Sequence, residues 1–351
     1  MQLLSRSDRR LTPDFHESVI QPKLSCAIVT HDVRRLLLLL LPACAVVAQS
    51  SAAEALIQGG HWKRARALVE GRIRENPDDA LANYLLSQVR GAFGDRDSPL
   101  PLAEKAVALD GRVAKYHRQV AEVVGVTAQH SNAIQQLFLA RRFRKEINAA
   151  LALDGRDPQA LRDLLEFYLL APRIAGGDPD KAPELARRIG QIEPPLGFLA
   201  EARVAEFHKQ TGETEALLRA AAKAAPPCYD ARIALARFYL EPANFDAAAA
   251  ESQARQAVQL DRTRADAYGV LAQTLAHRGA WAELESLLAE AAAAVPDDLT
   301  PYYRAAARLA ADGREAARAE RYLKIYLGQE PEGNEPTAAQ ATRELEQLHR
   351  K

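Results

Sequence analysis

The chain has 351 residues, of which 48% are hydrophobic, 26% charged and 6% aromatic. This composition excludes a disordered, collagen-like or disulfide-stapled protein, and the length suits a solenoid or two to three ordinary domains. The 46 basic and 46 acidic residues balance, so no global charge draws the chain to nucleic acid, and three cysteines make neither a disulfide framework nor a zinc site.

The first distinctive segment is an apolar run from Leu36 to Ala48, which opens with six leucines and follows Arg34-Arg35. The run is shorter than the about 20 residues that a helix needs to cross a bilayer. Basic residues, a short apolar run and small residues after it are typical of a secretory signal peptide. We therefore expect residues 1–48 to be an N-terminal extension and signal peptide, with the mature chain periplasmic or secreted. The alternative is the buried first helix of a cytoplasmic protein.

The start and the processing of this leader leave two questions open. Residues 1–32 carry four carboxylates, which do not suit a signal peptide, so we hypothesise that translation begins at Val33 on a GUG codon. The segment ending at Cys44 is similar to a bacterial lipobox, whose acylated cysteine anchors the protein to a membrane. Simple cleavage near Ala48 is the alternative, and it leaves Cys228 as the one cysteine of the mature chain.

From about residue 51 the sequence repeats itself. Gly60 of the pattern Gly60-x-Trp62 lies 17 residues before Pro77. Gly279 of the pattern Gly279-x-Trp281 lies the same number of residues before Pro296. The two tryptophans lie 219 residues apart, which is six units of 34 plus 15. Amphipathic helix ends between them recur with the same spacing, interrupted by two added lengths. A 34-residue period of paired helices is the tetratricopeptide signature.

On these residues the chain resembles the tetratricopeptide repeat family over residues 51–351. The best unit runs from Ala265 to Asp298, and its packing residues are Tyr268, Leu271, Ala272, Leu275, Gly279, Trp281, Leu284, Leu288 and Ala291. The resemblance implies an all-α, right-handed superhelical solenoid of about eight degenerate repeats, whose first helices line a concave surface that binds a protein or peptide. In such a solenoid each unit contacts only its neighbours.

Three segments depart from the plain repeat. We expect an insertion near 126–150, read as a loop from Val126 followed by a long helix, and a second at 171–180, which is rich in helix breakers. Either serves a binding edge or is a tolerated insertion. Proline 336 predicts the first turn of a C-terminal capping helix over 336–350, with an apolar stripe through Ala341 and Leu345.

No catalytic or cofactor motif is present, and the histidines fall in different units without metal-ligand spacing. We therefore expect no enzyme, no cofactor and no metal. The basic cluster Arg141-Arg142-x-Arg144-Lys145 is a solvated face or the contact of an acidic partner or membrane headgroup.

The first helices of units three to six carry the candidate partner-binding residues. They comprise five cations and two anions: Lys115, Arg118, Glu122, Arg162, Glu166, Arg232 and Arg237. The cation excess indicates a partner with an acidic or mixed-charge segment. We expect an exported scaffold without catalysis, the alternatives being a cytoplasmic adaptor and an accessory domain of an enzyme complex.

Overall fold

The computed structural model describes residues 52–350, which lie in one compact unit. The expected signal peptide and Cys44 lie outside these residues. All regular structure in the described part is helical. Residues 52–58 are followed by α2 (Trp62–Glu75), α3 (Ala80–Ala92), α4 (Pro99–Leu109), α5 (Ala114–Gln129), α6 (Ala133–Leu153), α7 (Pro158–Leu170), α8 (Ala182–Ile192), α9 (Pro194–Phe207), α10 (Thr211–Lys223), α11 (Tyr229–Phe238), α12 (Ala247–Leu260), α13 (Ala265–Arg278), α14 (Trp281–Ala294), α15 (Thr300–Ala311), α16 (Ala316–Tyr326) and α17 (Ala338–Leu348).

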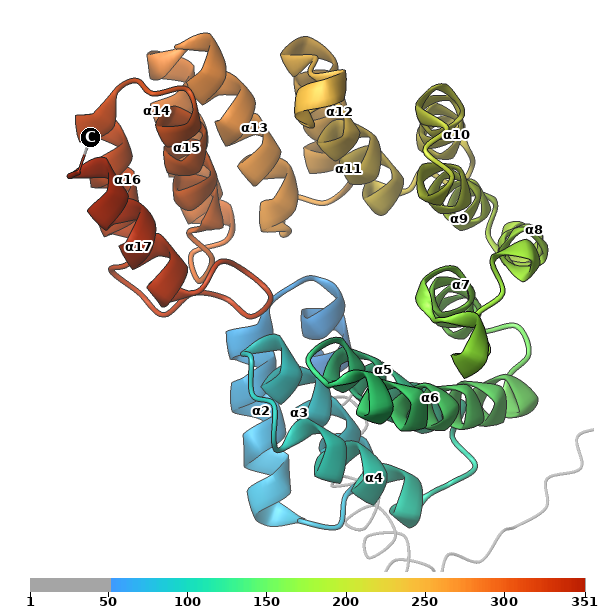
Figure 1. The fold of residues 1–351 in the computed structure, drawn as a ribbon. Coiled ribbons are helices and arrows are strands. Elements are labelled where there is room, and N and C mark those ends of the chain that lie inside the picture. The colour runs from blue at the N-terminus through green and yellow to red at the C-terminus, as the bar shows by residue number, and fades with distance from the viewer. Residues whose placement is uncertain (1–51, 351) are drawn as a thin grey trace, which may run out of the picture. The chain divides into compact units, whose positions relative to one another are not determined.

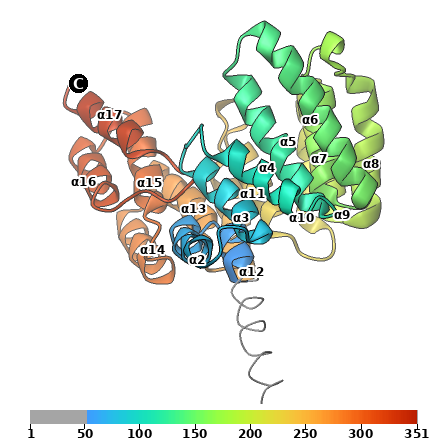
Figure 2. The ribbon, with the colours of Figure 1, turned by 90° about the horizontal axis from the view of Figure 1, so that it is seen from below.

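The helices form successive pairs that stack side by side around a curve (Figure 1). The described part contains eight such pairs, from residues 52–58 with α2 to α15 with α16, and α17 follows as a single helix. Figure 2 shows the same helices from below, with α5 and α6 projecting beside α7 and α8. The first helices α7, α9 and α11 contribute residues to one cavity, which places them on the concave side.

The unit from Ala265 to Asp298 packs as the sequence predicted. Tyr268 and Ala272 are buried in α13, and Leu284 and Leu288 are buried in α14. Gly279 ends α13 in the left-handed conformation with φ 71°, which glycine adopts without the steric cost of a Cβ. Small and large side chains alternate in this core, so the helices approach closely.

Substituting Ala272 by tryptophan should destabilise this unit strongly. Ala272 is fully buried and shares a core with Leu309 and Tyr322 of the next pair. A large ring has no space there, and overpacking costs about 1–3 kcal/mol or more. We expect a lower melting temperature by circular dichroism, whereas an unchanged melt would show that Ala272 does not lie at a tight helix crossing.

The first insertion lengthens two helices instead of forming a loop, so the loop predicted from Val126 is wrong. Helix α5 has 16 residues and α6 has 21, and only residues 130–132 connect them. No breaker interrupts α5 after Val126, and Asn132 starts α6 early because its side chain accepts a hydrogen bond from the Gln135 N–H. The second insertion holds two 3₁₀ turns, η1 (Arg173–Ala175) and η2 (Pro179–Lys181).

The capping helix begins two residues later than predicted from Pro336. Thr337 is the N-cap of α17, and its side chain accepts a hydrogen bond from the Gln340 N–H, while the Gln340 side chain accepts one from the Thr337 N–H. This capping box satisfies two backbone donors, which Pro336 at the first turn would not do. Ala341 is buried, and Leu345 packs against the core of the last pairs.

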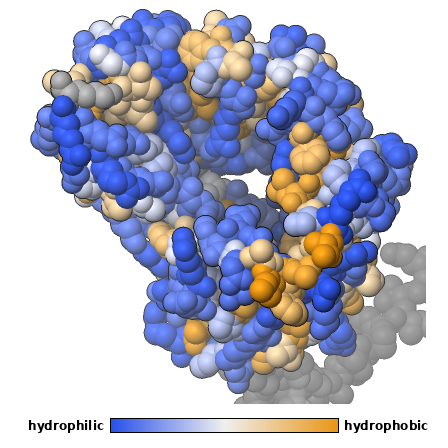
Figure 3. Space-filling model, viewed as in Figure 1, coloured by the Kyte–Doolittle hydropathy of each residue, from blue (hydrophilic) through white to orange (hydrophobic). Residues whose placement is uncertain are grey.

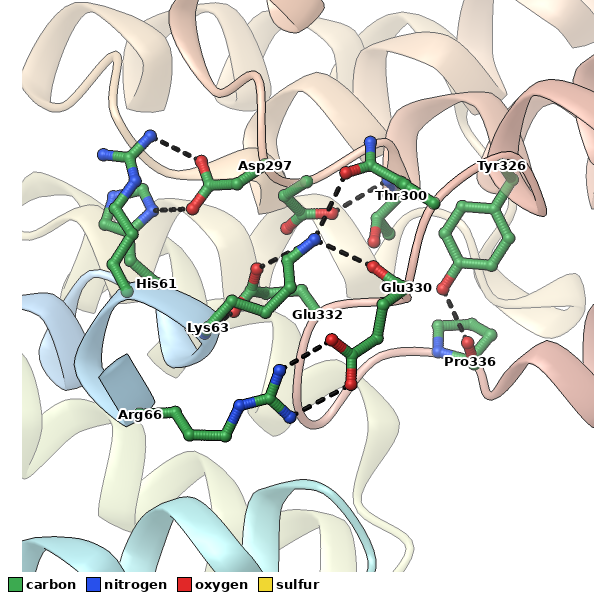
Figure 4. A network of polar contacts seen from close by, with 12 residues as sticks. His61, Lys63, Arg66, Asp297, Thr300, Tyr326, Glu330, Glu332 and Pro336 are labelled. Atoms are coloured by element: carbon green, nitrogen blue, oxygen red, sulfur yellow. Dashed lines mark hydrogen bonds and ion pairs between the residues drawn. The ribbon is translucent and has the colours of Figure 1, made fainter. Parts of the chain in front are cut away.

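The chain closes on itself, because the loop between α16 and α17 returns to α2 and α3 (Figures 1 and 4). The Lys63 N–H donates to Glu332 Oε1 at 2.5 Å, and Arg66 makes two hydrogen bonds of 3.0 and 2.6 Å to the Glu330 carboxylate. The Asn334 N–H donates to the Ala92 carbonyl at 2.8 Å. The expectation that each unit contacts only its neighbours is therefore wrong at the two ends.

Candidate functional site: a concave channel

The central cavity of the concave side lies over α7, α9, α10 and α11 and has a volume of about 390 Å³. Its apolar lining includes Leu199, Leu218 and Phe238. Charged side chains from α7 and α9 surround this lining, among them Arg162 and Arg203. Figure 3 shows hydrophobic surface on the inner wall of the opening, with hydrophilic surface around it. The cavity therefore combines an apolar floor with a charged rim.

A second cavity of about 380 Å³ lies between α5, α6 and α7. Phe143 and Phe167, which stack with ring centroids 5.1 Å apart, are part of its wall. Glu122, Asp163 and Glu166 add three carboxylates, and the lining has no Lys or Arg. This end of the concave side is therefore apolar and acidic.

Four cavities share lining residues and therefore lie next to one another, and we call this row of cavities the concave channel. Glu166 lines both the second and the central cavity. Arg237 and Glu241 connect the central cavity to a third one of about 460 Å³ along α13 and α15. Asp266 and Glu335 are shared by the third cavity and a fourth of about 270 Å³ beside α2. The channel thus extends from α5 to the contact that closes the chain.

The structure brings four of the seven predicted partner-binding residues into the channel. Arg162, Glu166 and Arg237 line the central cavity, and Glu122 lines the neighbouring one. The remaining three do not line it; they contact other parts of the protein, as described next.

Lys115, Arg118 and Arg232 have structural contacts instead. Lys115 forms an ion pair with Glu54 of the first pair, and Arg232 donates to the Gln253 side chain at 3.0 Å. The Arg118 side chain is only 15% exposed, and its guanidinium lies 3.4 Å from the Asp163 carboxylate. Arg118 therefore joins α5 to α7 and is not available to a partner.

Among the lining residues of the four cavities carboxylates outnumber cations, so the cation excess of the seven predicted residues does not extend to the whole lining. The cations are Arg162, Arg203, Lys209, Arg237 and Arg304, and the carboxylates are Glu122, Asp163, Glu166, Glu206, Glu241, Asp266, Asp298 and Glu335. The seven predicted residues include none from α9 or α13, because the sequence did not show which side of these helices faces the channel. Exposed polar positions one turn apart, such as Arg203 and Glu206, were the signal that could have revealed them.

Several of these charges are already paired across the channel wall. Arg203 donates two hydrogen bonds, of 2.8 and 3.0 Å, to the Glu166 carboxylate. Arg237 is paired with Asp266 of α13. Such bridges join successive first helices and neutralise part of the charge of the channel wall.

The acidic ends of the channel hold carboxyl groups whose pKa is raised. Burial raises the pKa of Asp163, an effect that the nearby Arg118 guanidinium opposes. Burial raises the pKa of Glu335 to about 7, again against the attraction of Arg304. A partner cation placed near these groups would favour their ionised form and be bound in return.

The residues described do not assemble a metal site, since no group of three or more His, Cys, Asp or Glu side chains among them is placed to hold an ion. Between residues 52 and 350, no helix has the length and apolar character of a membrane span. Cys228 is a free thiol of intermediate burial.

Comparison with known proteins identifies the fold. No protein-family model matches the sequence, and no curated protein sequence matches it. Yeast Tom70 is 16% identical with a TM-score of 0.53, and the match covers 82% of this chain and 58% of Tom70. A thermophilic TPR protein of Thermus thermophilus is 20% identical with a TM-score of 0.49, over 55% of this chain and 98% of that one. A tetratricopeptide repeat protein from Parabacteroides merdae is 12% identical with a TM-score of 0.41, over 86% and 98%.

These identities are too low to transfer an activity, and the likeness to Tom70, at a TM-score of 0.53, shows the fold alone. The helix pairs, whose first helices from α3 onward begin 34 to 36 residues apart except for the step of 44 from Ala114 to Pro158, and the likeness to Tom70 agree on an all-α helical-repeat solenoid of the tetratricopeptide type. The fold class predicted from the sequence is confirmed.

Proposed function

We propose that this protein is a non-catalytic scaffold that holds an extended segment of a partner protein in the concave channel. The observation that carries the proposal is the row of four adjacent cavities, which share Glu166, Arg237 and Glu335 as lining residues. A small molecule is usually enclosed in a single pocket, whereas a chain of apolar and charged subsites suits a polypeptide. Side chains of such a segment would enter successive cavities.

The lining favours a partner of mixed charge. Cations of the partner would face the acidic ends, near Glu122, whose side chain is 51% exposed, and near Glu335, and its carboxylates would face Arg162 and Lys209 of the central cavity. Apolar side chains would occupy the floor beside Phe238. Because salt screens charges over about 8–10 Å, association should slow as ionic strength rises.

We further propose that the scaffold acts outside the cytoplasm. The support is the sequence pattern of Leu36 to Ala48, which lies outside the described residues. Cell fractionation tests this directly, since an exported protein is shortened and leaves the cytoplasm. A full-length protein found in the cytoplasm would favour the adaptor alternative, and labelling with a fatty-acid analogue would reveal acylation of Cys44.

Reversing two channel charges should weaken partner capture about tenfold or more. We would combine Arg162→Glu and Arg237→Glu, because Arg237 is 59% exposed in its side chain and both residues line the central cavity. The measurement is the yield of a crosslinked partner recovered from native cells with each variant, normalised to the wild type.

The matched control for this experiment is Arg187→Glu on α8. The Arg187 side chain is 66% exposed and is paired with Glu184, so it resembles Arg237 but lies outside the channel lining. Capture should be unchanged in the control. If the channel variant retains full capture while its circular dichroism is native, the partner does not bind in the channel. Copurification of an enzyme whose activity depends on the scaffold would favour the accessory-domain alternative.

A further inference from the structure

The two insertions, together with Leu170 directly before the second, carry the most exposed large hydrophobic side chains of the described residues. Their exposed fractions are 80% for Ile174, 72% for Ile134, 63% for Phe138, 61% for Leu170 and 52% for Val126. Exposed apolar side chains that lie next to one another and are bordered by polar residues mark an interaction surface. The proposed channel uses Val126 and Leu170, which line its second cavity. It leaves the other three unexplained.

Ile134 and Phe138 lie on one face of α6, directed away from the protein core. Spacings of four, three and four residues place Arg141 and Lys145 on the same face, whereas Phe143 and Ile147 on the opposite face are buried. We call this surface, together with Ile174 of η1, the α6 outer face. Figure 3 shows strong hydrophobic colour over this region of the molecule.

Cations gather at the C-terminal half of the same face. An open cavity of about 420 Å³ lies between α6 and η1, and it is lined by Arg141, Arg144, Lys145 and Arg173 together with Ile174. Neither Arg141 nor Arg144 forms an ion pair with any residue in the described part. Four positive groups around one cavity, two of them without an ion-pair partner among residues 52–350, select an anion.

The acidic residues nearby are directed elsewhere or already paired. Glu146 contacts His117 at 2.8 Å and Lys145 at 3.8 Å, and its side chain is 13% exposed. Asp178 is paired with Lys181 at 2.9 Å, and Asp180 lies 3.8 Å from Arg173. The face therefore keeps a local positive charge in a chain whose total charge is zero.

We propose that the α6 outer face docks on an anionic phospholipid bilayer. The headgroup phosphates would occupy the basic cavity, and Ile134, Phe138 and Ile174 would enter the boundary between headgroups and acyl chains. Separate protruding apolar side chains beside basic ones are the arrangement of interfacial helices. A partner helix would instead need an apolar groove, and these three side chains stand out from the surface. The inference is independent of the channel and of Cys44.

Vesicle binding tests this proposal with the full chain. We would compare sedimentation with vesicles of phosphatidylcholine alone and of phosphatidylcholine containing about a third phosphatidylglycerol. The expected result is at least tenfold more binding to the anionic vesicles. Hydrogen exchange should slow in residues 133–148 and 173–176 on these vesicles, which separates the α6 outer face from any binding by the N-terminal apolar run.

Two variants separate the apolar from the basic contribution. Ile134→Ser with Phe138→Ser, and Arg141→Glu with Arg144→Glu, should each reduce the anionic preference at least tenfold. Both pairs alter exposed residues, so the fold should be preserved in circular dichroism. The matched controls are Ile325→Ser, which is 37% exposed on α16, and Arg187→Glu.

Three results would overturn the proposal. The first is equal binding to both vesicle types, and the second is wild-type binding by the two variants. The third is loss of binding in the arginine variant alone, with poly-glutamate competing fully, which would assign the face to an acidic protein partner.

Discussion

Replacing Gly333 by leucine should open the contact between the first and last repeats. A Cβ at Gly333 would lie 2.9 Å from Trp62 Cγ and 3.0 Å from Ala92 Cβ. These neighbours belong to α2 and to the end of α3, so the added side chain would separate the two ends of the chain. Overpacking of this kind costs about 1–3 kcal/mol. Because a single loop makes the closing contact, few other interactions would keep the two ends together.

Small-angle scattering should show a larger radius of gyration in this variant, and hydrogen exchange should accelerate in α2. Gly91→Leu is the control, because a Cβ at Gly91 meets no atom within 4 Å. The control should keep the wild-type radius. A Gly333→Leu protein as compact as the wild type would mean that the closing loop tolerates the side chain by shifting locally.

The repeat architecture was predictable because it depends on local, periodic signals. Gly279 and Pro296 mark a turn and a helix end at fixed distances, and Ala272 marks a close crossing. The length of α5 was not predicted. A repeat unit longer than 34 residues shows that residues were added, but not which structure they form. Whether they extend a helix depends on the absence of breakers after Val126 and on the Asn132 cap.

The closing contact could not be predicted in the same way. Lys63 and Glu332 are 269 residues apart, and Glu332 lies in a connection without a repeat pattern. The closure depends on the summed curvature of eight pairs, which small rotations at each interface determine. A sequence period gives the number of units but not the pitch of the superhelix.

Only part of the candidate site could be predicted, because the sequence pattern shows which side of a helix is exposed but not which residues its side chains contact. Arg162 and Arg237 line the channel, whereas Arg118 on the equivalent face of α5 is held by Asp163 of the next first helix. Opposite charges on successive first helices neutralise one another, so a count of cations on separate helices overestimates the free charge. Pairing across repeats requires the spatial register of α5 and α7.

The contact that closes the chain contains two carboxyl groups with opposite pKa shifts (Figure 4). The hydrogen bonds from Arg66 lower the pKa of Glu330. Burial raises the pKa of Glu332 to about 7, although the Lys63 N–H and its ammonium group oppose this effect, and the neighbouring Asp297 and Asp298 reinforce it. Glu332 is 3% exposed, and its Oε2 accepts no hydrogen bond from the described residues.

These shifts give the closure a pH optimum. Glu330 has a lowered pKa in the closed form, so its contribution is present above its ordinary value of 4.5 and is lost as the pH falls. Glu332 has a raised pKa, so its contribution is complete below 4.5 and is lost as the pH rises through about 7. Glu335 faces Arg304, Asp298 and Asp266, and its pKa is also raised to about 7, so its contribution has the same pH dependence as that of Glu332. The closed form should be most stable near pH 5–6.

Hydrogen exchange of α2 between pH 5 and 8.5, corrected for the intrinsic pH dependence of exchange, measures this effect. Protection should fall as the pH rises through about 7, because an ionised Glu332 is buried where water cannot solvate it. Glu332→Gln with Glu335→Gln keeps the acceptor for the Lys63 N–H but cannot ionise, so protection should then be nearly constant above pH 6. Glu346→Gln, at a side chain that is 58% exposed, should behave as the wild type. If the double variant loses protection with the same midpoint as the wild type, other groups control the closure, and the carboxyls beside Lys63 do not make it sensitive to pH.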